Sequence, residues 1–201
     1  MRDEILKQST DLFLERGFKS VTMDDIAQDM AISKKTIYQH FKNKTILVEE
    51  SVETLYHLIC NGIDHITQQR QNPIEELYEI KKFVLMHLKG EKSSPIYQLQ
   101  KYYPRIHASI RKRQFEHMQD CMIDNIKRGI AQGLFRENLN VEFVSRIYFI
   151  GMTGIKDNDM FDENIFHKEN LLEMYLEYHL RGIVTPKGRK RLNQLINSNH
   201  E

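Results

Sequence analysis

The sequence has few features of disulfide-stabilised, secreted or membrane-anchored proteins. Its two cysteines, Cys60 and Cys121, lie far apart and outside any Cys-x-x-Cys pattern. This spacing excludes a disulfide framework and favours a reducing compartment. No apolar run approaches membrane-spanning length, and the first residues lack the apolar stretch of a signal peptide. We therefore expect a soluble, cytoplasmic protein with no membrane partner.

A large excess of charge of either sign is also absent. The 29 Lys and Arg residues nearly balance the 28 Asp and Glu residues, and the formal net charge is +1. Without a global basic field, affinity for nucleic acid must come from a local cluster of cations. The charge balance therefore favours a sequence-specific DNA binder over a general DNA coat.

Strand patterns are missing, because apolar residues recur at helical spacing nearly throughout. We predict an all-α protein. Three of the prolines mark expected helix starts, because each follows Asn, Ser or Thr, the order of an N-cap and the first helical residue. Beyond the N-terminal region we predict helices over residues 44–69, 74–89, 95–102, 105–132, 141–155, 165–181 and 187–197.

Catalytic motifs are absent too. There is no glycine-rich phosphate loop, no Gly-x-Ser-x-Gly and no His-Glu-x-x-His. We predict no enzyme, no catalytic residue and no cofactor. Two helical pairs, His57 with Cys60 and His117 with Cys121, leave a Cys2His2 metal site conceivable. Such pairs arise easily by chance and no outer-shell pattern supports them, so we predict no metal.

A helix-turn-helix pattern occupies residues 22–47. Thr22 is a good N-cap with Asp25 in the capping-box position, and Ser33 caps a second helix after a short turn. The second helix places apolar residues on one face and polar, basic residues on the other, as a DNA-reading helix requires.

The charges of this second helix run against the helix dipole. Acids favour the first turn of a helix, yet this one opens with Lys34 and Lys35, and the next opens with Lys44. Each such cation costs about 0.3–1 kcal/mol when nothing is bound. No acid lies between Met30 and Ile46. Lysines beside free helix N–H groups suit phosphates, which points to DNA.

The same stretch resembles the N-terminal DNA-binding domain of the tetracycline-repressor (TetR) family. The residues that carry the resemblance are Gly17-Phe18, Thr22, Ile26-Ala27, Ser33, Thr36, Tyr38, His40-Phe41 and Lys44. The chain departs from the family with Ala31 at the frequent turn glycine, Lys35 at a small residue and Thr45 at an acid. The resemblance implies a three-helix DNA-binding head over residues 1–47 and a larger helical ligand-binding and dimerisation body over residues 48–201.

The resemblance and the lysine cluster together assign the DNA-binding surface. Lys34, Lys35 and Lys44 are expected on phosphates, and the resemblance puts the Tyr38 hydroxyl on a phosphate as well. The full set comprises Thr22, Lys34, Lys35, Thr36, Tyr38, Gln39, His40 and Lys44. The expected partner is a pseudo-palindromic double-stranded operator, bound by a homodimer that acts as a repressor.

The segment Val141–Ile155 is apolar on almost every side, so it must be buried in a core or at an interface. The resemblance makes it, with the next apolar helix, a four-helix dimer interface. We assign to it Ile147, Phe149, Gly151, Leu172, Tyr175 and Leu176. The alternative is a pair of central core helices in a monomer.

Aromatic and methionine side chains between these parts suit a cavity for a small, largely apolar effector. The predicted lining is Tyr56, Phe83, Met86, Tyr102, His107 and Met118. Core packing is the alternative for each residue taken singly. For the whole chain, two alternatives stand beside the ligand-responsive repressor: a DNA-binding or architectural protein controlled by a partner protein, and an all-α enzyme.

Overall fold

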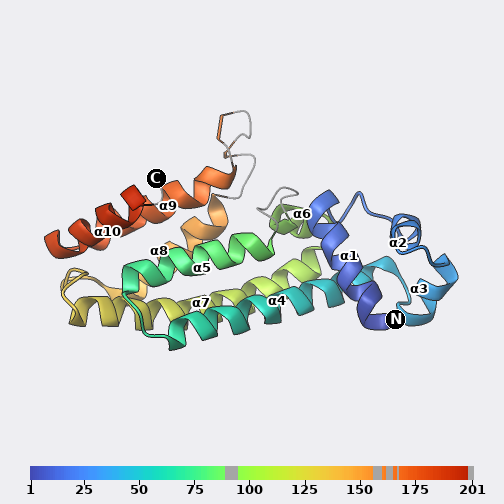
Figure 1. The fold of residues 1–201 in the computed structure, drawn as a ribbon, viewed down its shortest axis with the longest axis horizontal. Coiled ribbons are helices and arrows are strands. Elements are labelled where there is room, and N and C mark those ends of the chain that lie inside the picture. Colours follow the sequence, from blue (N-terminus) through green and yellow to red (C-terminus); the bar gives the residue numbers. More distant parts are fainter. Residues whose placement is uncertain (89–94, 156–159, 162–164, 167, 199–201) are drawn as a thin grey trace. The chain divides into compact units, whose positions relative to one another are not determined.

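The structure is a computed structural model that describes residues 1–88, 95–155, 160–161, 165–166 and 168–198. Over these ranges it is helical and contains no β-strand, only an isolated bridge between Phe135 and Val184. The predicted all-α class is confirmed. In chain order (Figure 1) the helices are α1 Arg2–Arg16, α2 Met23–Asp29, α3 Lys34–His40, α4 Lys44–Gln68, α5 Pro73–His87, α6 Pro95–Tyr102, α7 Pro104–Ala131, α8 Val141–Gly154, α9 Lys168–Ile183 and α10 Pro186–Ser198.

Local capping chemistry explains many of these helix starts. The Oδ1 of Asn72 accepts a hydrogen bond from the Ile74 N–H at 2.9 Å, and α5 begins at the intervening proline. Thr185 caps α10 in the same way, through the Gly188 N–H at 3.1 Å. The start of α9 differs from the prediction: the helix begins at Lys168 and not at residue 165.

The chain divides into two compact units. Unit 1 comprises Met1–Asn61 and Val84–Lys112, and unit 2 comprises Gly62–Phe83 and Arg113–Glu201. Helix α4 supplies residues to both. This division follows packing and differs from the predicted division into residues 1–47 and 48–201, which concerns function and stays a prediction.

Unit 1 has its own apolar core, built around the first three helices. Phe13 of α1, Ile26 of α2 and Ile37 of α3 are fully buried in it, and Leu99 of α6 joins them. The rings of Phe13 and Phe18 stack with centroids 5.3 Å apart. The short helices α2 and α3 are therefore held in place by burial, since helices of seven residues are marginal alone.

Unit 2 has a second core, to which α5, α7, α8, α9 and α10 contribute. Leu176 and Leu180 of α9 and Phe135 after α7 are fully buried. A carboxylate is buried with them: Glu76 of α5 accepts hydrogen bonds from Arg128 Nη2 and Asn125 Nδ2, each at 2.7 Å. Pairing of this kind is needed because an isolated buried charge is costly.

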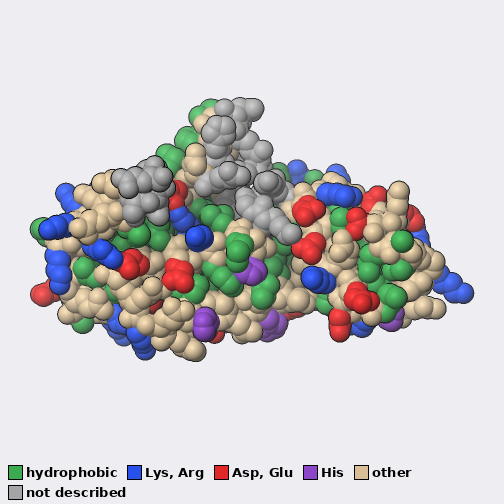
Figure 2. Space-filling view, viewed as in Figure 1, with side chains coloured by type: hydrophobic (Ala, Val, Ile, Leu, Met, Phe, Trp, Pro, Cys, Tyr) green, Lys and Arg blue, Asp and Glu red, His purple; other side chains and the backbone are tan. Residues whose placement is uncertain are grey.

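The surface carries charges of both signs. On the face shown in Figure 2, Lys and Arg side chains intermingle with Asp and Glu and form no large field of one sign. None of the described helices combines the length and apolar character needed to cross a membrane.

Candidate nucleic-acid interface

Helix α3 is fixed at its start and along its apolar face. Ser33 caps it by accepting a hydrogen bond from the Thr36 N–H at 3.0 Å. Ile37 and, just after the helix, Phe41 are fully buried in the unit 1 core. The predicted cap and apolar face are thus both present, and they determine which side chains of α3 point outward.

The turn before α3 depends on a left-handed residue. Ala31 has φ 52°, a conformation that favours glycine, and the following Ile32 N–H donates to the Ala27 carbonyl at 3.0 Å. Helix α2 begins with the predicted capping box, in which the Asp25 N–H donates to Thr22 Oγ1 at 3.1 Å and the Thr22 N–H donates to Asp25 Oδ2 at 2.7 Å. The Thr22 hydroxyl, predicted to contact DNA, is therefore part of this cap.

The outward face of α3 carries the other predicted DNA contacts. Lys35, Gln39 and His40 are exposed, and Tyr38 is 45% exposed although it is a large aromatic residue. Lys35 and Gln39 are four residues apart, so they lie on the same helix face. The Thr36 hydroxyl lies 2.8 Å from that of Ser33, within hydrogen-bonding distance. The exposed side chains form a polar and cationic row on a helix whose opposite face is buried.

Lys34 has an acidic partner. Its Nζ donates to Asp24 Oδ2 at 2.7 Å, and this hydrogen bond raises the pKa of Lys34 above its ordinary value. The ion pair offsets the unfavourable position of this lysine at the helix start. Sequence reasoning missed Asp24, because a contact between two helices leaves no periodic signal. To contact a phosphate, the Lys34 ammonium must break its hydrogen bond to the Asp24 carboxylate.

Lys44 is also engaged. Its Nζ donates to the Lys19 carbonyl at 3.1 Å and lies 6.0 Å from the centre of the Phe13 ring. Burial lowers the pKa of Lys44 below its ordinary value, with Asp25 acting in the opposite direction. The helix that Lys44 opens is capped by Asn43, whose Oδ1 accepts from the Ile46 N–H at 3.0 Å.

The residues predicted for the dimer interface lie on two sides of α8 and α9. Phe149, Leu172 and Leu176 are buried within the chain itself, whereas Ile147 is 40% exposed. Gly151 lies against the Tyr175 ring, whose hydroxyl donates to the Ile147 carbonyl at 2.8 Å. Three of the six predicted interface residues therefore pack against residues of their own chain.

The same helices also carry exposed apolar residues, of which sequence reasoning assigned only Ile147 to an interface. They are Phe143, Ile147 and Ile150 of α8 with Met174 and Tyr178 of α9, which are 40–77% exposed. We call this set the α8–α9 face. Its signal is in the sequence, because residues at i, i+4 and i+7 lie on one side of a helix. Because α8 is apolar on almost every side, its sequence does not distinguish the side that faces the core from the side that is exposed.

The predicted effector-lining residues are divided between the two units. Tyr56, Met86, Tyr102 and His107 belong to unit 1, and Phe83 and Met118 belong to unit 2. Met86 is 64% exposed and Tyr102 is 38% exposed, with the Lys19 ammonium 4.8 Å from the Tyr102 ring centre.

The other predicted lining residues are half-buried. Tyr56 packs against the unit 1 core and Met118 against the unit 2 core. The Phe83 ring occupies the space above Gly62. Burial, with the nearby Arg111, lowers the pKa of His107. Their role in a single effector cavity stays a prediction.

The two histidine–cysteine pairs also belong to different units. His57 is exposed and lies 3.9 Å from a Glu53 carboxylate oxygen. Among the described residues of unit 1, neither His57 nor Cys60 belongs to a group of three side chains that could bind a metal ion. His117 and Cys121 instead approach Asp64 of α4.

Comparison with known proteins gives one family match and several relatives. Residues 5–51 match the family described as bacterial regulatory proteins, tetR family. The chain is 24% identical over 201 residues to the HTH-type transcriptional repressor KstR2 of Mycolicibacterium smegmatis, covering 94% of this chain and 93% of that protein. It is 35% identical over 80 residues to IcaR of Staphylococcus aureus, the HTH-type negative transcriptional regulator of the biofilm operon icaADBC, covering 39% of this chain and 42% of IcaR.

Solved structures share the fold. SmeT, the repressor of the Stenotrophomonas maltophilia multidrug efflux pump SmeDEF, aligns with a TM-score of 0.67 at 18% identity, covering 92% of this chain and 91% of SmeT. A complex of SmeT with triclosan aligns with a TM-score of 0.65, also at 18% identity, covering 92% of each chain. The relatives named here are regulators of transcription.

Proposed function

Because this chain belongs to the TetR family of bacterial regulatory proteins, we propose that it represses transcription as a homodimer on a pseudo-palindromic operator and is released by a small effector. It is a DNA-binding regulator and not an enzyme. The observation that carries the proposal is the outward row of α3, in which Lys35, Tyr38, Gln39 and His40 are exposed on a helix whose other face is buried.

The row suits the major groove. Gln39 can bond bidentately to an adenine edge and Lys35 can reach a guanine edge or a phosphate, while the Tyr38 hydroxyl can donate to a phosphate. Salt dependence should follow from the phosphate contacts. If Lys34, Lys35 and Lys44 of both protomers contact phosphates, about six contacts give a log–log salt slope of about −5.

The α8–α9 face supports a homodimer. Its five large apolar side chains point away from the core of their own chain, and exposed apolar clusters mark interaction sites. A two-fold pair of chains would cover this face with its own copy and would present two α3 helices to a pseudo-palindrome. The inner side of the same helices, with Leu172 and Leu176, remains in the core of each protomer.

A small effector is proposed from the likeness in fold to SmeT, which has a solved complex with triclosan. An effector can release DNA only by binding the released conformation more tightly. A coupling of about 1–3 kcal/mol between the two sites is typical, and DNA must then weaken effector binding by the same factor. In the proposal the effector is largely apolar and is bound among the predicted aromatic and methionine side chains.

The test is selection of bound sequences from random DNA, followed by fluorescence titration of the selected operator. We expect Lys35→Ala to weaken binding and to flatten the salt slope by about two for a dimer, since one cation is lost from each protomer. Gln39→Ala should change which base is preferred. Lys127→Ala, an exposed lysine of α7, is the control and should change neither. Equal affinity of the wild-type chain for selected and random DNA would refute the proposal.

A further inference from the structure

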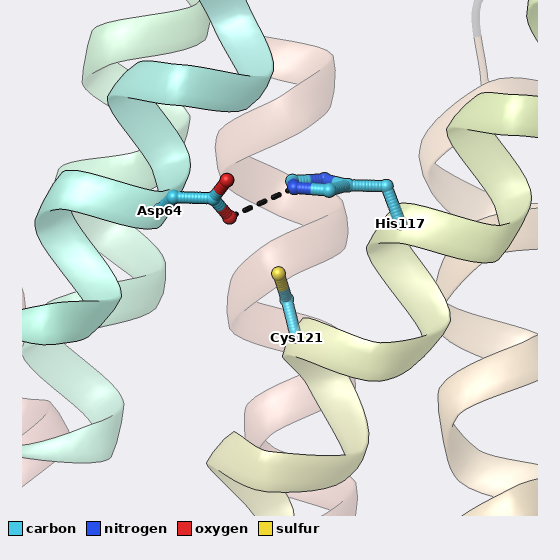
Figure 3. Close-up of side chains that lie close together, drawn as sticks. All are labelled: Asp64, His117 and Cys121. Carbon is cyan, nitrogen blue, oxygen red and sulfur yellow. Dashed lines mark hydrogen bonds and ion pairs between the residues drawn. The ribbon is translucent and has the colours of Figure 1, made fainter.

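Three side chains with different metal-binding atoms meet between α4 and α7 within unit 2. Asp64 extends from α4, and His117 and Cys121 extend from successive turns of α7 (Figure 3). His117 Nε2 lies 2.9 Å from Asp64 Oδ1, and the cysteine sulfur points toward the same space. The carboxylate oxygen, ring nitrogen and sulfur all lie within 4.8 Å of one another. We propose that these three residues form a binding site for Zn²⁺.

The spacing is close to that of a zinc site. Zinc binds carboxylate oxygen and imidazole nitrogen at about 2.0–2.2 Å and thiolate sulfur at about 2.3 Å, in a tetrahedral arrangement. These bond lengths put neighbouring ligand atoms about 3.3–3.6 Å apart. The sulfur must approach the other two ligand atoms by no more than about 1 Å, and the histidine and the aspartate must separate slightly. The i, i+4 spacing of His117 and Cys121 already places them on one face of α7.

The ligand set determines the kind of ion. A thiolate disfavours Mg²⁺ and Ca²⁺, which take oxygen ligands, and a carboxylate disfavours Cu(I), which prefers sulfur. One sulfur, one nitrogen and one oxygen suit a borderline divalent ion, and zinc is the common one of this kind. Three protein ligands leave the fourth tetrahedral position for water or for a ligand from solution.

The hydrogen bond between Asp64 and His117 orients the site without metal. It holds two of the three ligands near their bound positions, which reduces the entropy that binding must overcome. When zinc binds, His117 coordinates through a nitrogen without a proton, and the Cys121 thiol loses its proton to solvent. Binding should therefore release protons and weaken as the pH falls.

The site is independent of the proposed DNA contacts. Asp64 is far along α4 from Lys44, and no residue of the α3 row takes part. The structural alternative is that the Asp64–His117 hydrogen bond only joins two helices and Cys121 only packs beside it. These readings differ in what Cys121 does, because packing tolerates serine and zinc ligation does not.

The experiment is a zinc titration of the full chain, without a histidine tag and treated first with a chelator that is then removed. Competition with a coloured zinc indicator measures stoichiometry and affinity, and Co²⁺ used in place of zinc reports thiolate ligation by its absorption. We expect one ion per chain and a cobalt–thiolate absorption band.

Three variants decide the outcome. Cys121→Ser and Asp64→Asn each remove one ligand and should weaken zinc binding by more than the roughly 10- to 100-fold that losing an outer-shell partner costs. Cys60→Ser removes the other cysteine, in unit 1, and should leave binding unchanged. Asp64 has a half-exposed side chain, so its variant tests the site without disturbing the core. Absence of binding at micromolar zinc, or binding that Cys121→Ser leaves unchanged, overturns the proposal.

Discussion

The α8–α9 face gives a quantitative prediction for the homodimer through Ile150. Replacing Ile150 by alanine removes three carbons, and each buried CH₂ contributes about 0.8 kcal/mol. The side chain is 59% exposed in the single chain, so only that fraction is left for a partner to cover. The loss is about 1.4 kcal/mol per copy, or about 3 kcal/mol for the two copies of a two-fold interface. This corresponds to a roughly 100-fold higher dimer dissociation constant.

Sedimentation equilibrium of the wild-type chain and the variant over a range of concentrations measures this constant. The matched control is Leu58→Ala on α4, because Leu58 is also a large exposed apolar side chain, at 47% exposure, and lies outside the α8–α9 face. The control should dimerise like the wild type. The assignment is wrong if the wild-type chain is monomeric at micromolar concentration. It is also wrong if Leu58→Ala dissociates the dimer and Ile150→Ala does not.

Three further predictions concern stability and binding. Burial lowers the pKa of His179 to about 4 from the usual 6.5, so the free energy of unfolding should fall by about 3 kcal/mol as the pH falls from above 6.5 through 4. Denaturant titrations across that pH range should show that His179→Leu removes this fall. Gly151→Ala should cost about 1–3 kcal/mol in urea unfolding, because its Cβ would lie 2.0 Å from the Tyr175 ring, while the control Gly154→Ala, with open space around it, should not destabilise. Ser33→Ala should cost about 1 kcal/mol through loss of the α3 cap and should weaken operator binding, and unchanged affinity would show that the cap does not orient the α3 row.

The helices and their caps were predictable because the forces that set them are local. Thr22, Ser33 and Asn72 each accept a hydrogen bond from a backbone N–H two or three residues later, so a short stretch of sequence contains both partners. The buried face of α3 was predictable for the same reason, since Ile37 and Phe41 are one helical turn apart. Recognition of the DNA-binding segment followed from these local patterns.

Contacts between distant segments were decided by the tertiary structure. Phe149 faces the core and Ile150 faces outward on a helix that is apolar on nearly all sides, so periodicity could not separate the two. The partner of Lys34 is ten residues away on another helix, and the partner of His117 is 53 residues away on α4. The sequence left a site of His117 and Cys121 with His57 and Cys60 only conceivable, whereas the fold places Asp64 beside His117 and Cys121. Sequence determines which side chains share a helix face, but the packing of one helix on another determines which faces meet.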